Sequence, residues 1–343
     1  MAGRGRPPRR GLTIGVDIGG TKVAAGVVTP AGQVLDRERR ETPDRSKSPR
    51  DVEETIVAAV LSLSQRYPVA AVGVGAAGFV DVDRSTVLFA PHLAWRNEPL
   101  RDALTARLGR PVVVENDANA SAWAEIRMGA GQGHTDVLVV NLGTGIGGAI
   151  VREGRLQRGY SGLAGEFGHM VVVPGGHRCE CGNRGCWEQY ASGNALTRDA
   201  RELVAADSPV AEGLIRAVDA DPERITGPLV TQLARAGDRA CAELLDDAGG
   251  WLGLGLANLA AAFDPELIIV GGGVSDADDL LLGPARRTYL RNLTGRGFRP
   301  QAPVRAAALG NDAGMIGAAE LARAELPRWR RQRRLRPGRP SAQ

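Results

Sequence analysis

The sequence lacks any uninterrupted run of about 18 apolar residues, which is roughly the minimum for a helix that crosses a membrane. Its N-terminus also lacks the apolar core of a secretory signal, so we expect a cytoplasmic protein without a membrane segment. Hydrophobic residues make up 43% and charged residues 24% of the 343 positions, which is ordinary for a globular protein. The chain is long enough for two domains, each with its own core.

Acidic residues are missing from both ends of the chain. Residues 1–10 contain four arginines and residues 327–343 contain seven, with no aspartate or glutamate in either segment. Setting these eleven arginines aside changes the formal net charge from +4 to −7, so the body between the ends is mildly acidic. The body therefore gives no indication of a basic face for nucleic acid. We expect residues 1–11 and 327–343 to be basic, disordered tails.

Cysteine is scarce, but three of the four cysteines lie within eight residues, and a histidine precedes them by ten. Glycines between the cysteines allow a short loop to fold back on itself. The spacing predicts a four-coordinate structural zinc site formed by His169, Cys179, Cys181 and Cys186. Three free thiols and a chance histidine in a reducing compartment are the alternative, whereas a disulfide would leave one cysteine unpaired.

An apolar run over residues 12–29 is interrupted by Asp17-Ile-Gly19-Gly20-Thr21-Lys22, which predicts strand, glycine turn, strand. The turn lacks the longer loop of a P-loop, and no helix follows it as in a dinucleotide-binding fingerprint. Such a turn lets phosphate oxygens approach backbone N–H groups, with Asp17 at its mouth, although glycine hairpins without a ligand are common. Lys22 is left outside the site, since a surface ion pair explains it equally well.

A second strand–glycine–strand pattern begins 124 residues later, with Asn141-Leu-Gly143-Thr144-Gly145-Ile-Gly147-Gly148. Two similar hairpins about a domain apart suggest a duplicated fold whose halves both face one phosphate chain. A buried strand at 267–270 then runs into three consecutive glycines. These glycines are further candidates for a position beside a nucleotide.

Polar residues follow directly after a strand predicted at 111–114. The run Glu115-Asn116-Asp117-Ala118-Asn119 stands at the C-terminal end of that strand, where ligand-binding residues cluster in α/β sheets. An Asx-type cap on a helix over 118–128 is the structural alternative.

Helical periodicity or small-residue packing predicts the remaining helices. They cover 51–66, 99–108, most of 195–262 with breaks at three prolines, a segment beginning near 278, and a small-residue helix from 312. Pro327 is expected to end this last helix, and another buried strand is expected over 69–74.

Together these residues resemble the ROK family of sugar kinases and related repressors, and within it the glucokinases. The resemblance spans nearly the whole chain between the basic ends, and its most specific piece is Cys179-x-Cys-Gly-x-x-Gly-Cys-x-Glu188. It implies an α/β fold of two actin-like (ribonuclease H-like, ASKHA) domains with an interdomain cleft where ATP and sugar meet. We expect a smaller N-terminal domain of residues 12–117 plus 312–326, and a larger domain of residues 118–311 that carries the zinc loop.

The resemblance also implies roles for individual residues, with Asp117 as the catalytic base. The sugar would be held by Asn116, Asp117, Glu166, His169 and Glu188. The zinc ligands would be His169, Cys179, Cys181 and Cys186. ATP, with Mg²⁺ near Asp17, would be bound by Asp17, Gly19, Gly20, Thr21, Gly143, Thr144, Gly145, Gly147, Gly271, Gly272 and Gly273.

The implied activity is the ATP-dependent phosphorylation of glucose at its 6-hydroxyl, by a homodimer or homotetramer. Carboxylates accept hydrogen bonds from vicinal hydroxyls, and His169 has one ring nitrogen for zinc and one for the sugar. Mannose, fructose or an N-acetylhexosamine as acceptor, and polyphosphate as donor, remain open. A sugar-sensing repressor of the same family would need a helix-turn-helix ahead of the first hairpin, and only eleven residues precede Leu12.

Overall fold

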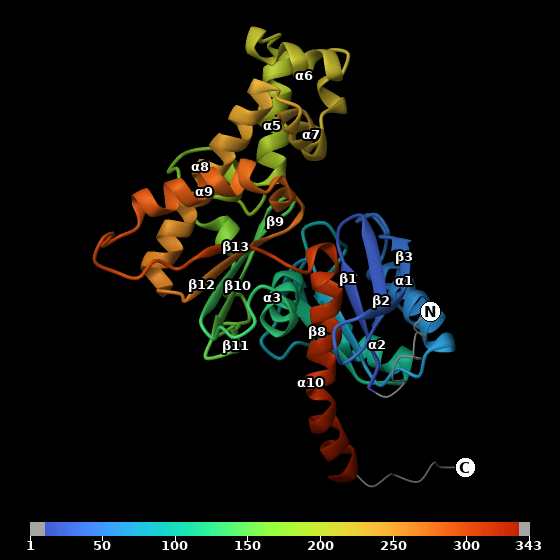
Figure 1. The fold of residues 1–343 in the computed structure, drawn as a ribbon. Coiled ribbons are helices and arrows are strands. Elements are labelled where there is room, and N and C mark those ends of the chain that lie inside the picture. The colour runs from blue at the N-terminus through green and yellow to red at the C-terminus, as the bar shows by residue number, and fades with distance from the viewer. Residues whose placement is uncertain (1–10, 336–343) are drawn as a thin grey trace, which may run out of the picture. The chain divides into compact units, whose positions relative to one another are not determined.

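The computed structural model describes residues 11–335, which form two compact α/β units (Figure 1). Unit 1 comprises the chain up to Gln132, the short segment Arg158–Ala164 and the chain from Asp312 onward. Unit 2 comprises Gly133–Gln157 and Gly165–Asn311. Among residues 11–335, no helix combines the length and the apolar character needed to span a bilayer.

Unit 1 is built on a five-stranded sheet in the order β3-β2-β1-β4-β8. The first three strands of the chain are antiparallel neighbours, whereas β1, β4 and β8 run parallel. Their register places Ile18, Ala76 and Asn116 side by side, so the C-terminal ends of β1, β4 and β8 share one edge. The strands are β1 (Thr13–Ile18), β2 (Lys22–Val28), β3 (Val34–Glu41), β4 (Val72–Ala76) and β8 (Val112–Asn116), and a separate small sheet contains β5 (Phe79–Val80), β6 (Val87–Phe89) and β7 (Arg96–Glu98).

Two pairs of helices accompany this sheet. α1 (Pro49–Arg66) and α2 (Leu100–Leu108) pack together, and α1 begins with a capping box in which Ser48 and Asp51 satisfy each other's backbone N–H groups. α3 (Asp117–Met128) packs on the long helix α10 (Ala313–Leu335), which lies along β1 and β4. Glycine is required where α10 crosses the sheet, because a Cβ on Gly15 would lie 1.8 Å from the carbonyl oxygen of Met315.

Unit 2 repeats the arrangement of unit 1. Its sheet has the order β11-β10-β9-β12-β13, with β9, β10 and β11 antiparallel and β9, β12 and β13 parallel. The strands are β9 (Val137–Leu142), β10 (Ile146–Arg152), β11 (Arg155–Gln157), β12 (Leu267–Gly271) and β13 (Val304–Ala306). The shared strand order confirms the duplicated fold that the two glycine hairpins suggested.

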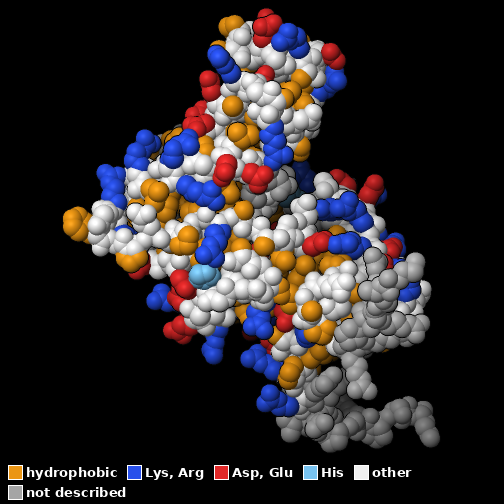
Figure 2. Space-filling model, viewed as in Figure 1, with side chains coloured by type: hydrophobic (Ala, Val, Ile, Leu, Met, Phe, Trp, Pro, Cys, Tyr) orange, Lys and Arg blue, Asp and Glu red, His pale blue; other side chains and the backbone are white. Residues whose placement is uncertain are grey.

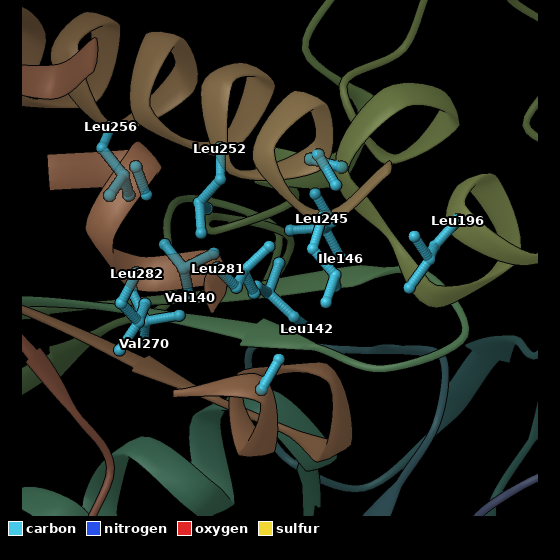
Figure 3. Packing of buried hydrophobic residues seen from close by; sticks show 14 of the residues in the cluster. Val140, Leu142, Ile146, Leu196, Leu245, Leu252, Leu256, Val270, Leu281 and Leu282 are labelled. Atoms are coloured by element: carbon cyan, nitrogen blue, oxygen red, sulfur yellow. The ribbon is translucent and has the colours of Figure 1, made fainter. Parts of the chain in front are cut away.

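The helices of unit 2 enclose its largest core. Figure 3 shows side chains of the sheet clustered with those of α8, α9 and α5: Val140, Leu142, Ile146, Val270, Leu245, Leu252, Leu256, Leu281, Leu282 and Leu196. The helices are α4 (Glu188–Ala191), α5 (Gly193–Ala205), α6 (Glu212–Ala217), α7 (Gly227–Arg235), α8 (Arg239–Phe263) and α9 (Asp279–Asn292). Pro209, Pro222 and Pro228 each stand in the first turn of a helical segment, where the missing N–H costs nothing, so these prolines begin helices as well as separate them.

Three expectations from the sequence differ from the structure. Residues 118–132 and 158–164, expected in the larger domain, lie in unit 1, because α3 packs on α10 and Arg158 pairs with Glu115 of β8. The helix expected to end at Pro327 continues to Leu335, with the proline inside it, so residues 327–335 are not a disordered tail. Gly11 is also held, since its carbonyl oxygen accepts a hydrogen bond from Arg323. The remaining tail residues, 1–10 and 336–343, lie outside the described part of the chain.

The described surface carries both signs of charge. On the face shown in Figure 2, basic and acidic side chains are intermingled on both units. Many charged side chains of the described residues form ion pairs, such as Arg50 with Glu54 at 3.2 Å and Arg287 with Asp246 at 2.6 Å. Exposed pairs of this kind contribute little to stability, about 0–1 kcal/mol each, and keep the surface solvated.

Candidate active site

The turn Gly19–Thr21 in unit 1 is braced by its neighbours. The N–H of Gly19 donates to the carbonyl oxygen of Lys22 at 3.0 Å, and the hydroxyl of Thr42 donates to the carbonyl oxygen of Gly19 at 2.8 Å. The side chain of His92 lies against Gly20, where a Cβ would be 3.1 Å from that of the histidine. A side chain at Gly20 would therefore press against His92, whereas Gly19 has room for one.

Asp17 lies one residue before the end of β1, next to this turn. Burial raises the pKa of its carboxyl group, and the charge of Lys22 partly opposes that effect. The start of α10 approaches the same carboxylate, because a Cβ on Gly314 would lie 3.0 Å from Oδ1 of Asp17. A cation would favour the ionised form of this carboxylate, so Asp17 suits the Mg²⁺ role expected of it.

Asn116 and Asp117 stand at the junction between β8 and α3. Asn116 is the helix N-cap: its Oδ1 accepts from the N–H of Asn119 at 3.1 Å, and its Nδ2 donates to the carbonyl oxygen of Gly78 at 3.1 Å. The Asx cap weighed as an alternative is thus present. One lone pair and one N–H of the amide remain for a ligand, because each group has a second hydrogen-bonding position.

Asp117 is the first residue of α3. Burial, and then the nearby carboxylate of Asp17, raise its pKa to about 7, although its side chain accepts a hydrogen bond from the N–H of Ala118 at 2.9 Å. A carboxylate with a pKa near the working pH is an effective general base, because it binds a proton readily and is still largely ionised. The position and the pKa of Asp117 therefore match the role expected of it.

Unit 2 brings the four expected zinc ligands together. The ligand atoms of His169, Cys179, Cys181 and Cys186 all lie within 4.8 Å of one another. Sγ of Cys179 is 3.6 Å from Nδ1 of His169, and Sγ of Cys181 is 3.6 Å from Sγ of Cys186. In a tetrahedral site with bonds of about 2.3 Å to sulfur and about 2.0 Å to nitrogen, ligand atoms lie roughly 3.5–3.8 Å apart. The donor set and its spacing fit zinc.

Backbone contacts shape the loop that carries these ligands. Gly185 adopts a φ of +80°, and a Cβ there would lie 1.7 Å from the carbonyl oxygen of Val173. The next anchor is Trp187, which is fully buried and donates from Nε1 to the carbonyl oxygen of Trp251 in α8 at 2.8 Å. Burial, with the Glu188 carboxylate nearby, raises the pKa of the Cys179 thiol. A metal cation would offset that effect by stabilising the thiolate.

His169 presents its two ring nitrogens in different directions. Nδ1 faces the thiol of Cys179, whereas Nε2 lies 4.0 Å from Oε2 of Glu166. Glu188 follows the cysteine loop, and its Oε2 accepts from the N–H of Ile146 at 3.4 Å. A Cβ on Gly145 would lie 2.5 Å from the same oxygen, so this glycine gives the carboxylate room. The zinc loop and the second glycine hairpin therefore meet at Glu188.

A cavity of about 670 Å³ opens in unit 2 beside the second glycine hairpin. This volume is typical of small-molecule sites. The start of α5 forms one wall, where the N–H of Gly193 donates to the carbonyl oxygen of Gly143 at 2.9 Å. The other walls come from α7 and from the turn after β12. The cavity is lined by Gly143, Thr144, Gly193, Asn194, Leu196, Thr197, Gly227, Pro228, Thr231, Gln232, Arg235, Gly273 and Val274.

Only some of the nucleotide residues expected in unit 2 line this cavity. Gly143, Thr144 and Gly273 do. The other four, Gly145, Gly147, Gly271 and Gly272, are not among its lining residues. Two of them have backbone roles instead: Gly272 has a φ of +86°, and a Cβ on Gly271 would lie 2.9 Å from Oδ1 of Asn141. The walls from α5 and α7 were missed, because their residues are far from any glycine motif in the sequence.

Comparison with known proteins agrees with the family resemblance drawn from the sequence. The profile described as "ROK family" matches residues 13–325 of this chain. The chain belongs to the ROK family. This confirms the resemblance drawn from the sequence, and the match covers both units.

Three ROK relatives are informative. The glucokinase of Streptomyces coelicolor is 49% identical over 317 residues, covering 92% of this chain and 99% of that protein. The crystal structure of a ROK family glucokinase from Streptomyces griseus in complex with glucose and AMPPNP is 51% identical, with a TM-score of 0.84, and covers 91% of this chain and 99% of the other. The xylose repressor of Bacillus subtilis is 28% identical, and the match covers 81% of this chain and 68% of the repressor.

Proposed function

We propose that this protein transfers the γ-phosphoryl group of ATP to the 6-hydroxyl of glucose. One observation supports this proposal most strongly: the carboxyl group of Asp117 has a pKa of about 7 and lies at the same sheet edge as Asp17 and the glycine turn. The near full-length similarity to glucokinases, one of them crystallised with glucose and an ATP analogue, supports this activity over that of a repressor.

In the proposed reaction Asp117 accepts the proton of the 6-hydroxyl as that oxygen attacks the γ-phosphorus. The transition state of phosphoryl transfer is loose, so a weak base suffices if it is well aimed. Asp17 would hold Mg²⁺, which when bound supplies positive charge to the phosphates. The backbone N–H groups of Gly20 and Thr21 would approach the phosphate oxygens.

The sugar would be bound by Asn116, Asp117, Glu166, His169 and Glu188. The direction of Nδ1 supports a division of roles in His169, with this nitrogen on zinc and Nε2 on a sugar hydroxyl. On this proposal zinc fixes the imidazole ring and the loop that leads to Glu188. Zinc is thus structural, and the chemistry belongs to Asp117.

The adenosine part of ATP would occupy the cavity beside the second hairpin. Leu196, Pro228 and Val274 would give the base an apolar surface to pack on, and Thr197 and Gln232, which also line the cavity, would offer polar atoms. The start of α5 would lie beside the phosphates, because the positive end of a helix dipole favours negative charge, although the N–H groups of Gly193 and Asn194 already donate to the carbonyl oxygens of Gly143 and Thr144.

We also propose a cytoplasmic homodimer or homotetramer, as the family resemblance implies. None of the four cysteines, all of which lie in the described part of the chain, forms a disulfide, which is ordinary in a reducing compartment. Mannose, fructose or an N-acetylhexosamine as acceptor, and polyphosphate as donor, are the alternatives to test.

The deciding experiment is a coupled ADP-release assay over a panel of hexoses, with polyphosphate replacing ATP in a parallel series. Product formation with glucose and ATP at the highest kcat/KM is the expected result. A preference for another hexose would correct the substrate, and binding of a sugar without any turnover would refute the kinase assignment.

A further inference from the structure

Glu115 carries a buried carboxylate next to the proposed site and takes no direct part in the proposed reaction. Its side chain is 3% exposed. Oε2 accepts two hydrogen bonds from the guanidinium of Arg158, from Nε at 2.8 Å and Nη2 at 2.5 Å. Oε1 accepts from Nδ2 of Asn119 at 3.1 Å and from the backbone N–H of Asn116 at 3.2 Å. The carboxylate thus binds the first residues of α3 on one side and Arg158 on the other.

Arg158 is itself held firmly by the loop Arg158–Ala164, which belongs to unit 1. The loop closes on itself, because the carbonyl oxygen of Arg158 accepts from the N–H of Ala164 at 3.0 Å. Gly162 has a φ of +96°, and a Cβ there would lie 2.4 Å from the carbonyl oxygen of Val80. These contacts tie both ends of the loop that carries Arg158, which limits the entropy lost when the guanidinium pairs with Glu115.

We infer that Arg158 is a positioning residue for Asp117, acting through the carboxylate of Glu115. The inference rests on the proposed function, in which Asp117 is the base. Arg158 does two things on this view. It fixes the β8–α3 junction from which the Asp117 side chain extends, and it balances a negative charge only two residues from that side chain.

The charge balance is open to test because the surroundings of Asp117 are simple. The Cα atoms of Glu115 and Asp117 are at most about 7 Å apart along the chain. The negative charge of Asp17 in β1 contributes to the raised pKa of Asp117, and the positive charge of Lys22 in β2 acts on Asp17 in the opposite direction. Gly75 of β4 and Gly314 of α10 approach these two aspartates, and neither carries charge. Without Arg158, the charge of Glu115 would raise the pKa of Asp117 further, on the order of one unit for two charges separated by several ångströms.

The test compares pH profiles of kcat/KM for glucose, measured by ADP release, in four proteins: wild type, Arg158→Met, Glu115→Gln and the double variant. In Arg158→Met, the rise of kcat/KM on the acidic side of the profile (the acid limb) should move to higher pH by about one unit. This shift lowers the rate about fivefold at pH 7 and much less at pH 9. The double variant should return the limb close to wild type, because no uncompensated charge remains. KM for ATP should stay constant throughout.

Arg84→Met is the matched control. Arg84 forms a half-buried ion pair with Glu325 at 2.6 Å, also within unit 1. Its loss should lower stability and leave the acid limb unchanged.

A loss of rate that is equal at every pH would be explained by the fixing of the β8–α3 junction alone, and it would overturn the inference that Arg158 acts on Asp117 through the charge of Glu115. If Arg158→Met does not fold, Glu115→Gln decides alone. This variant leaves the positive charge of Arg158 in place and should move the acid limb to lower pH, whereas an unmoved limb would refute the charge coupling. Absence of turnover in the wild type would instead refute the proposed function itself.

Discussion

Replacing Asp117 by asparagine removes the group that is proposed to accept the sugar proton. The raised pKa of Asp117 also sets how the wild type should respond to pH. With a pKa of about 7, the carboxylate is about 9% ionised at pH 6 and about 91% ionised at pH 8. If only the ionised form is active, kcat/KM for glucose rises about tenfold across this interval. Asp117→Asn should lower the rate by about 100- to 10,000-fold and abolish the rise.

The assay is ADP release at saturating ATP from pH 5.5 to 8.5, with excess coupling enzyme verified at each pH. Calorimetric titration with glucose at pH 8 provides the binding control. Affinity should change much less than turnover, because Asn116, Glu166, His169 and Glu188 keep their polar groups. A wild-type profile flat between pH 6 and 8, or a variant within a few-fold of wild-type turnover, would refute Asp117 as the base.

The same pKa predicts an effect on stability. The folded pKa of Asp117 lies above its ordinary value of 3.8, so the folded state favours the protonated form. The contribution of Asp117 to the free energy of unfolding is therefore fully present below about pH 4, and it is lost as the pH rises through 7. Asp117→Asn should melt at a higher temperature than wild type at pH 8, and the difference should disappear near pH 4. An equal difference at both pH values would show that ionisation is not its cause.

Three further predictions concern the metal, the long C-terminal helix and the chain ends. Cys186→Ala should lose its zinc by elemental analysis and weaken glucose binding, whereas Cys241→Ala should keep both; a fully active, zinc-free Cys186→Ala protein would contradict the site. Arg323→Met should cost about 3–5 kcal/mol in denaturant unfolding, because a largely buried carboxylate loses its partner, while Arg328→Met, at an exposed pair, should cost less than about 1 kcal/mol. A chain of residues 11–335 should keep its kcat and KM, and loss of activity would assign the removed ends a role.

Features that depend on neighbouring residues in the sequence were predicted correctly. The four predicted zinc ligands lie within 18 residues, so their spacing and the glycines between them were enough to predict that they converge. Alternating apolar residues around the glycine turns predicted both hairpins, and the repeat of the motif predicted the repeated sheet. The position of Asp117 followed from the end of a strand.

Contacts between distant segments could not be predicted in this way. Arg158 and Glu115 are 43 residues apart, and neither stands in a pattern that names the other. The boundary after Asp117 was misplaced because the partner of α3 is α10, nearly 200 residues further along the chain. Pro327 illustrates a different limit, since the local preference of proline to stop a helix did not prevail in α10.

The return of α10 to unit 1 determines the order in which the chain becomes complete during synthesis. The strands that bear Gly15 and Gly73 leave the ribosome before unit 2, yet the helix whose backbone fills the space beside them is synthesised only after unit 2. Unit 2 consists of residues 133–157 and 165–311, so all of its strands and helices are present while the first sheet still lacks its cover. Unit 1 thus begins before unit 2 in the chain and can be completed only after it. A chain broken off before Ala313 would expose an apolar sheet face to chaperones and proteases.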